Sequence, residues 1–141
     1  METNNYPNWL VSIEQAKKLK EIGFDKPTQN NTSDYVLESK RYKDENKLYS
    51  NEYVLKGLYN ANETKEGISI PTWEQVFEWF REKGLYHSIC FTDDLPHEVK
   101  FFEAEIRDKN ADIICIISRL TYEEVREALL NKLIEIYEDN L

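Results

Sequence analysis

Apolar side chains recur at the spacing of an α-helix in three segments of the chain, 12–22, 72–83 and 121–136. Each segment opens on Ser or Thr, with Gln or Glu three residues later. This is the pattern of a capping box, in which the two residues satisfy each other's free backbone N–H groups. Gly23 and Gly84 follow the first two segments, and glycine there adopts the left-handed conformation that ends a helix. The pattern therefore predicts three α-helices.

Between the second and third helical segments the period of the apolar positions changes from 3.6 to 2. Residues 85–92 and 99–107 alternate apolar and polar positions, and residues 113–120 form an almost wholly apolar run. These runs predict three strands, and their short connections favour an antiparallel meander. The apolar run suggests a central strand covered on both faces, or a strand beneath a helix.

The segment from 30 to 66 is less regular. Apolar positions at 35–37 and 48–49 flank a polar stretch at 43–47, which predicts a hairpin, and residues 60–67 are expected to form a loop. The expected fold class is α+β, with a small antiparallel sheet (a three-stranded meander over 85–120 plus the hairpin) packed against three helices. A chain of 141 residues with 13% aromatic content fits one globular domain, 1–141.

Charge is unevenly distributed along the chain. The 18 Lys and Arg against 27 Asp and Glu give a net charge of −9, and residues 67–141 carry −8 of it, with 16 acids and 8 bases. The basic stripe of a nucleic-acid-binding surface is absent, so we expect no direct binding of nucleic acid. A basic protein surface is the partner that this charge favours.

The chain shows no pattern of a membrane span or a signal peptide. Its longest wholly apolar run, 113–117, is far shorter than the roughly 20 residues of a spanning helix. The first residues lack a basic segment followed by a hydrophobic one. Cys90 and Cys115 lie in apolar, strand-like runs, and we interpret them as reduced, buried thiols. These features predict a cytoplasmic protein.

Catalytic patterns are weak. His87 and Cys90 are three residues apart, so in a strand they point to opposite faces and could not share a metal ion. No glycine-rich phosphate loop and no serine nucleophile elbow is present. We expect neither an enzyme nor a bound metal or cofactor. The alternative is a metal-dependent hydrolase or nuclease-like enzyme centred on Asp93, Asp94, Glu98 and Lys100.

Two features favour binding. Glutamates on the second strand and the last helix could attract a groove of Arg and Lys, and a tyrosine-rich middle could supply contact area. The candidate partner-binding residues are Glu103, Glu105, Glu123, Glu124, Glu127, Tyr35 and Tyr49.

Three phrases of the sequence carry a resemblance. They lie at 12–25 (SIEQAKKLKEIGFD), 70–81 (IPTWEQVFEWFR) and 122–134 (YEEVREALLNKLI), and in that order they resemble small uncharacterised proteins of Bacteroidetes genomes and their phages. The resemblance covers the three helices, while residues 30–62 depart from it. It implies a phage or mobile-element protein that binds and blocks a basic host defence effector, as anti-CRISPR proteins do.

The function we expect is therefore that of a non-enzymatic, acidic protein-interaction module. An inhibitor of a nucleic-acid-handling host effector is the form that the resemblance implies. Besides the metal-dependent enzyme, a further alternative is a phage accessory protein that self-associates through Trp9, Trp79 or the last helix. The sequence leaves the oligomeric state open.

Overall fold

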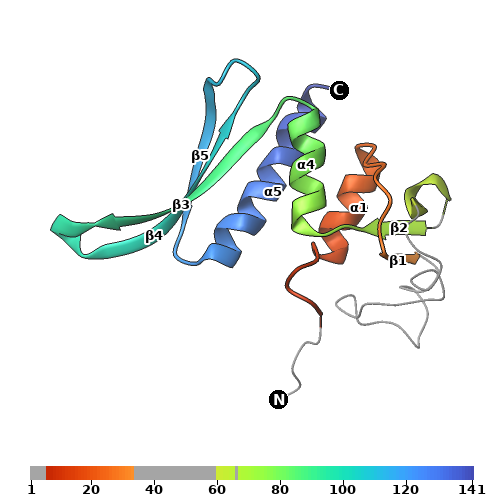
Figure 1. Cartoon of the computed structure of the whole chain (residues 1–141), viewed down its shortest axis with the longest axis horizontal. Helices are drawn as coiled ribbons and strands as arrows, with labels where there is room; N and C mark the ends of the chain where they lie inside the picture. Colours follow the sequence, from red (N-terminus) through yellow and green to blue (C-terminus); the bar gives the residue numbers. More distant parts are fainter. Residues whose placement is uncertain (1–5, 34–59, 66) are drawn as a thin grey trace. The chain divides into compact units, whose positions relative to one another are not determined.

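The computed structural model describes residues 6–33, 60–65 and 67–141 (Figure 1). The chain divides into two compact units, Met1–Val76 and Phe77–Leu141, and the boundary falls inside helix α4 (Trp73–Glu82). The single domain expected from chain length stays a prediction. The fold class is α+β, as expected, with three helices and two antiparallel sheets among these residues.

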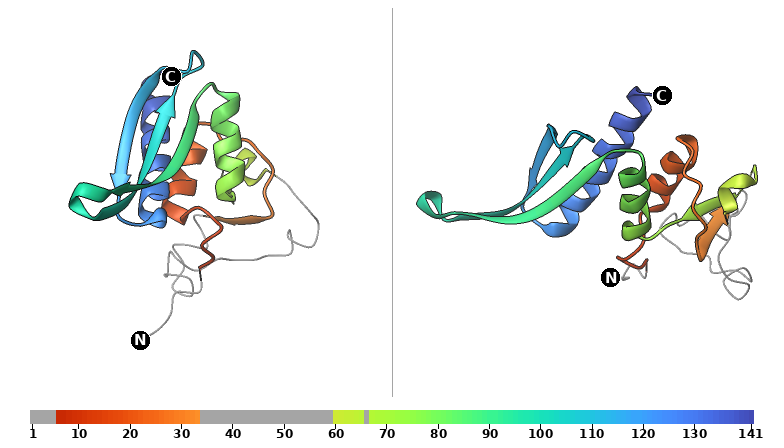
Figure 2. Two further views of the ribbon diagram at one scale, coloured as in Figure 1. Left: turned by 60° about the vertical axis from the view of Figure 1, so that its left-hand side comes forward. Right: turned by 45° about the horizontal axis from the view of Figure 1, so that its top comes forward.

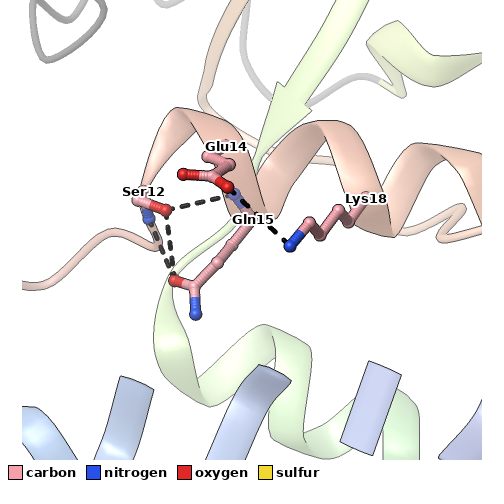
Figure 3. Close-up of polar contacts among 4 residues, drawn as sticks. All are labelled: Ser12, Glu14, Gln15 and Lys18. Atoms are coloured by element: carbon pink, nitrogen blue, oxygen red, sulfur yellow. Dashed lines mark hydrogen bonds and ion pairs between the residues drawn. The ribbon is translucent and has the colours of Figure 1, made fainter. Parts of the chain in front are cut away.

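The first unit begins with α1 (Ile13–Glu21), whose predicted capping box is present. The Gln15 N–H donates to Ser12 Oγ at 3.1 Å, and the Ser12 N–H donates to Gln15 Oε1 at 3.4 Å (Figure 3). Glu14 and Lys18 form an exposed ion pair of 3.8 Å on the same helix. After the helix, Gly23 has a φ of 96°, and the Phe24 N–H donates to the Leu19 carbonyl at 2.9 Å. The predicted helix end is thus confirmed.

A two-stranded sheet in this unit was not expected. β1 (Asn30–Ser33) pairs antiparallel with β2 (Gly67–Ile70), and a short 3-10 helix, η2 (Ala61–Glu63), precedes β2. The segment 60–67 is therefore only partly a loop. The sequence pattern did not predict β1 because its four residues are all polar, so they show no alternation of apolar and polar positions. The hairpin predicted over 35–49 lies outside the described residues.

The core of the first unit lies around α1 and β2. The Tyr6 hydroxyl donates a hydrogen bond to the Val11 carbonyl, and burial raises the pKa of this phenol above its ordinary value. The start of α4 has the predicted capping box, because the Gln75 N–H donates to Thr72 Oγ1 at 3.2 Å and the Thr72 N–H donates to Gln75 Oε1 at 3.0 Å. The buried apolar residues of this unit are Leu10, Val11, Ile13, Ala16, Leu19, Ile22, Phe24, Ala61, Ile68, Ile70 and Val76.

The second unit contains the predicted meander. β3 (Tyr86–Asp94), β4 (Val99–Arg107) and β5 (Ile113–Arg119) form a three-stranded antiparallel sheet in the order β3-β4-β5. The register pairs Ile89 with Ala104 and Ala104 with Ile117, and a bulge interrupts the β4–β5 ladder between Ile106 and Arg107. A 3-10 turn, η3 (Leu95–His97), connects β3 to β4.

Helix α5 (Tyr122–Asp139) runs along one face of this sheet, against β4 and β5 (Figures 1 and 2). Its N-cap is Thr121, whose Oγ1 accepts from the Glu124 N–H at 3.2 Å. The buried apolar residues of this unit are Phe77, Trp79, Phe80, Ala104, Ile106, Val125, Leu129, Leu130, Leu133 and Ile134. Trp79 is among them, so its proposed role in self-association is wrong: its ring packs 5.1 Å from that of Tyr137 inside the unit.

β5 differs from the expectation of a strand covered on both faces. It is the outer strand of the three-stranded sheet, and only one of its faces lies beneath α5. The large side chains of Ile113, Ile114 and Ile116 are exposed. The alternative of a strand beneath a helix is correct for that one face.

No helix among the described residues is long and apolar enough to cross a membrane.

Candidate binding surface

The three-stranded sheet has two unlike faces. On one face Ala104 and Ile106 are fully buried, and the same face carries Phe102, whose ring centroid lies 5.9 Å from that of Tyr122 at the start of α5. The helices therefore cover the face of these even-numbered β4 residues. The opposite face carries Glu103 and Glu105, because successive side chains of a strand alternate.

This alternation separates the five glutamates expected to form one acidic surface. Glu103 and Glu105 lie on the sheet face away from α5, and Glu105 is paired with Arg107 (Oε1 to Nε, 2.5 Å). The second group, on the first two turns of α5, is exposed and consists of Glu123, Glu124 and Glu127. The structure thus places the glutamates in two groups on different surfaces of the unit. Tyr35 and Tyr49 lie outside the described residues.

A row of three aromatic side chains, which we call the aromatic row, extends from the sheet to α5. Phe91 of β3 packs on Phe102 of β4 with ring centroids 5.1 Å apart, and Phe102 meets Tyr122 of α5. Phe91 is 60% exposed and Tyr122 is 41% exposed. The row is open because β3 and β4 continue beyond the end of β5: Phe102 pairs with Arg119, the last residue of β5 (Figure 1).

Charged and apolar groups surround the aromatic row. Leu120, in the connection between β5 and α5, is 71% exposed. The Arg126 guanidinium lies 5.4 Å from the centre of the Tyr122 ring, in the geometry of a cation–π contact. Glu123 and Glu124 directly follow Tyr122, and Glu124 Oε1 accepts from the Thr121 hydroxyl at 2.8 Å. The surface therefore combines exposed aromatic rings with adjacent carboxylates.

The residues of the enzyme alternative lie at the β3–β4 turn. Asp93 is opposite Lys100 in the strand register, and Asp94 Oδ2 pairs with His97 Nδ1 at 3.0 Å. Glu98 has a φ of 54°, in the left-handed region that Glu rarely adopts. Within the described ranges, no three His, Cys, Asp or Glu side chains are grouped so that they could hold a metal ion.

The cysteines are placed differently from the expectation. His87 packs on Phe77 with ring centroids 4.2 Å apart, on the helix side of β3, so Cys90 points to the opposite face, as strand geometry predicts. Both Cys90 and Cys115 are free, but neither is buried: Cys90 is exposed and Cys115 is partly exposed. The buried-thiol interpretation is wrong because the sheet face of Cys90 is not covered by any described segment of its unit.

Reasoning from the sequence missed the aromatic row. By strand alternation, Phe91 shares a face of β3 with His87 and Ile89. Phe102 likewise shares a face of β4 with Ala104 and Ile106. Both faces were expected to be buried in the core. What exposes these rings is strand length: β3 and β4 have nine residues each, whereas β5 has seven and begins opposite Arg107. The predicted bounds assign eight residues to 113–120, one fewer than to 99–107 and as many as to 85–92, so they did not reveal the row.

No family model matches this chain, and neither a curated protein nor a solved structure does so.

Proposed function

We propose that this chain is a non-enzymatic protein-interaction module, and that the aromatic row and the α5 glutamates bind a basic surface on a partner protein. The exposure of Phe91 and Tyr122 in a continuous contact with Phe102 carries this proposal. Large exposed aromatic side chains with a polar rim are typical of protein–protein interfaces, where aromatic residues are enriched and a few residues contribute most of the binding energy.

The chemistry of the surface favours Arg and Lys from the partner. Aromatic faces attract these cations, and the Arg126–Tyr122 contact is one such interaction within the chain itself. The neighbouring Glu123, Glu124 and Glu127 can pair with further cations. A nucleic-acid-handling effector is one such partner, because the groove that contacts phosphates is rich in Lys and Arg.

The test compares variants of the row in a pull-down from cells of the native source, with quantification of the captured protein by mass spectrometry. We expect one basic protein to be retained by the unaltered chain and to be lost as salt rises, because salt screens exposed charges. Phe91→Ala and Tyr122→Ala should each weaken its binding by about thirtyfold, the loss typical of an aromatic residue at the centre of an interface.

Tyr86→Ala is the matched control. Tyr86 is also an exposed aromatic residue of β3, but it is paired with Arg107 at the other end of the strand. Its truncation should leave binding unchanged. If Tyr86→Ala weakens binding as much as Phe91→Ala does, the aromatic row is not the binding surface.

Charge reversal separates the two groups of glutamates. The pair Glu123→Lys and Glu127→Lys should weaken binding, whereas the pair Glu103→Lys and Glu105→Lys, which adds the same charge on the opposite face of the sheet, should not. Equal effects of the two changes would indicate a response to total charge rather than a contact with α5.

A further inference from the structure

The two edges of the three-stranded sheet differ in their protection against pairing with another strand. β3, at one edge, carries the charged side chains of Asp93 and Asp94. β5, at the other edge, has no charged residue from Ile113 to Ser118, and its Ile116 is 53% exposed. Natural proteins protect edge strands with charges, because an open edge offers free N–H and C=O groups to another strand. β5 lacks that protection along most of its length.

A groove lies along β5 on the side of α5. It holds about 440 Å³. One wall is β5 from Cys115 to Arg119, and the other is one flank of α5. The helix residues of that wall are spaced i, i+3, i+4 and i+7, and they are Ala128, Asn131, Lys132 and Glu135.

Three charged side chains line this groove: Arg119 from β5, and Lys132 and Glu135 from α5. β5 and α5 are joined by Leu120 and Thr121, so they run in opposite directions from that connection. Arg119 therefore lies at the connected end. Glu135 lies about 20 Å along α5 from Tyr122, and Ile113 lies about 20 Å along β5 from Arg119, by the rise per residue of a helix and of a strand. Glu135 forms an ion pair with Lys132 at 3.3 Å, and the side chains of Lys132 and Glu135 are 36% and 60% exposed.

We propose that β5 pairs antiparallel with β5 of a second copy of this chain, around a two-fold axis perpendicular to the sheet near Ile116. Such a symmetric contact requires a surface that is complementary to itself. In the antiparallel arrangement, each end of the groove in one copy lies beside the opposite end of the groove in the other copy. Arg119 of one copy therefore approaches Glu135 of the other. The uncharged centre, with Ile116 and Ile117, lies at the axis, and the small Ala128 lets the two α5 helices approach.

The size of this contact indicates a weak dimer. A seven-residue strand is about 23 Å long and a sheet with one helix layer about 20 Å deep, so each copy would bury about 450 Å². The resulting total of about 900 Å² lies below the roughly 1,200 Å² typical of stable complexes. The dimer should therefore dissociate on dilution. It uses a surface of β5 and α5 that the proposed partner-binding function does not require.

The experiment measures the mass of the full chain by light scattering and sedimentation, from roughly 5 µM to 500 µM. We expect the mass to rise from 16.8 kDa toward twice that value as concentration increases. Arg119→Glu and Glu135→Arg should each weaken dimerisation at least tenfold, because each change places like charges together at both ends of the contact. The double variant R119E/E135R should restore it. Glu123→Arg reverses a charge of α5 outside the groove and should leave dimerisation unchanged.

Alkylation of the two free thiols gives a second measurement. Cys115 lines the groove, while Cys90 lies on β3 at the other edge of the sheet. Dimerisation should slow the alkylation of Cys115 as concentration rises, with no change at Cys90. A chain that remains monomeric over the whole range overturns the proposal. Dimerisation that is unchanged in both single charge-reversal variants also overturns it. So does protection of Cys115 from alkylation only when a different protein is added, because β5 would then pair with a strand of that protein.

Discussion

At the scale of single residues, the ammonium group of Lys20 makes three hydrogen bonds to backbone carbonyls in the first unit. Its Nζ donates to the carbonyl oxygens of Thr64 and Lys65, both at 2.9 Å, and of Gly67 at 2.5 Å. An ammonium group has three N–H donors, so all three are used. Lys20 thereby joins α1 to the turn that precedes β2. Nothing in the sequence pattern distinguishes it from Lys17 and Lys18, which lie on the same helix.

We predict that Lys20→Met lowers the free energy of unfolding by about 1–2 kcal/mol. The methionine keeps most of the aliphatic stem but leaves three carbonyls without their charged donor, and hydrogen bonds to charged groups contribute more than neutral ones. Lys18→Met is the matched control, because the exposed ion pair of Lys18 with Glu14 should contribute close to nothing. Urea denaturation of both variants checks this. Equal losses for the two would show that the carbonyl contacts of Lys20 do not stabilise the fold.

At the scale of elements, local signals predicted the helices well. Three residues that begin or end helices make the expected hydrogen bonds, all to residues close in sequence: Ser12, Thr72 and Gly84. In the second unit β3 and β4 were predicted from their alternation and β5 from its apolar run, and the bounds of β4 match the prediction at both ends. These features depend on nearby sequence, which is why they could be predicted without the fold.

The position of an element within a sheet depends on residues far away in the sequence. The apolar run of β5 predicted burial, but strand order leaves β5 at an edge. Phe91 and Phe102 carry the pattern of core residues, yet Phe91 is exposed and Phe102 is partly exposed, where β5 ends beside Phe102. The candidate surface therefore required the three-dimensional arrangement of strands, although each of its residues lies in an element that was predicted.

The turn between β4 and β5 contains a strained residue that offers a test at this scale. Ala111 has a φ of 67°, and its N–H donates to the Asp108 carbonyl at 2.9 Å. An L-residue in the left-handed region costs about 1–2 kcal/mol, which glycine avoids.

We predict that Ala111→Gly raises the free energy of unfolding by about 0.5–1 kcal/mol, after subtraction of the greater freedom of glycine in the unfolded chain. Asn110→Gly, one residue earlier and without a positive φ, should lower it by about 0.5 kcal/mol or more. Denaturant unfolding of the two variants decides between these signs. A loss of stability in Ala111→Gly would mean that the left-handed residue is not under strain.

At the scale of the whole molecule, the same acidic excess that favours a basic partner also acts on the chain itself. Residues 67–141 carry −8 of the net charge of −9, and the exposed glutamates of α5 belong to this part. Like charges repel within the folded state, so an excess of one sign lowers the stability of a compact protein. The cost is smallest where salt or a basic partner neutralises the excess. The same carboxylates should therefore determine both the binding of a basic surface and the stabilisation of the fold by salt.

We predict that the melting temperature rises as NaCl increases from about 10 mM to 150 mM, because the screening length falls from about 30 Å to 8 Å over that range. The double change Glu123→Lys and Glu127→Lys moves the net charge from −9 to −5, since each reversal adds two, and should reduce this dependence on salt. The slope of melting temperature against salt is the quantity to compare, because replacing Glu123 also removes a favourable charge from the first turn of α5 and lowers the absolute value. The measurement belongs at a protein concentration low enough to keep the chain monomeric. If the melting temperature of the unaltered chain falls as salt increases, attraction within its ion pairs outweighs the repulsion among its carboxylates. The acidic excess then does not destabilise the folded state.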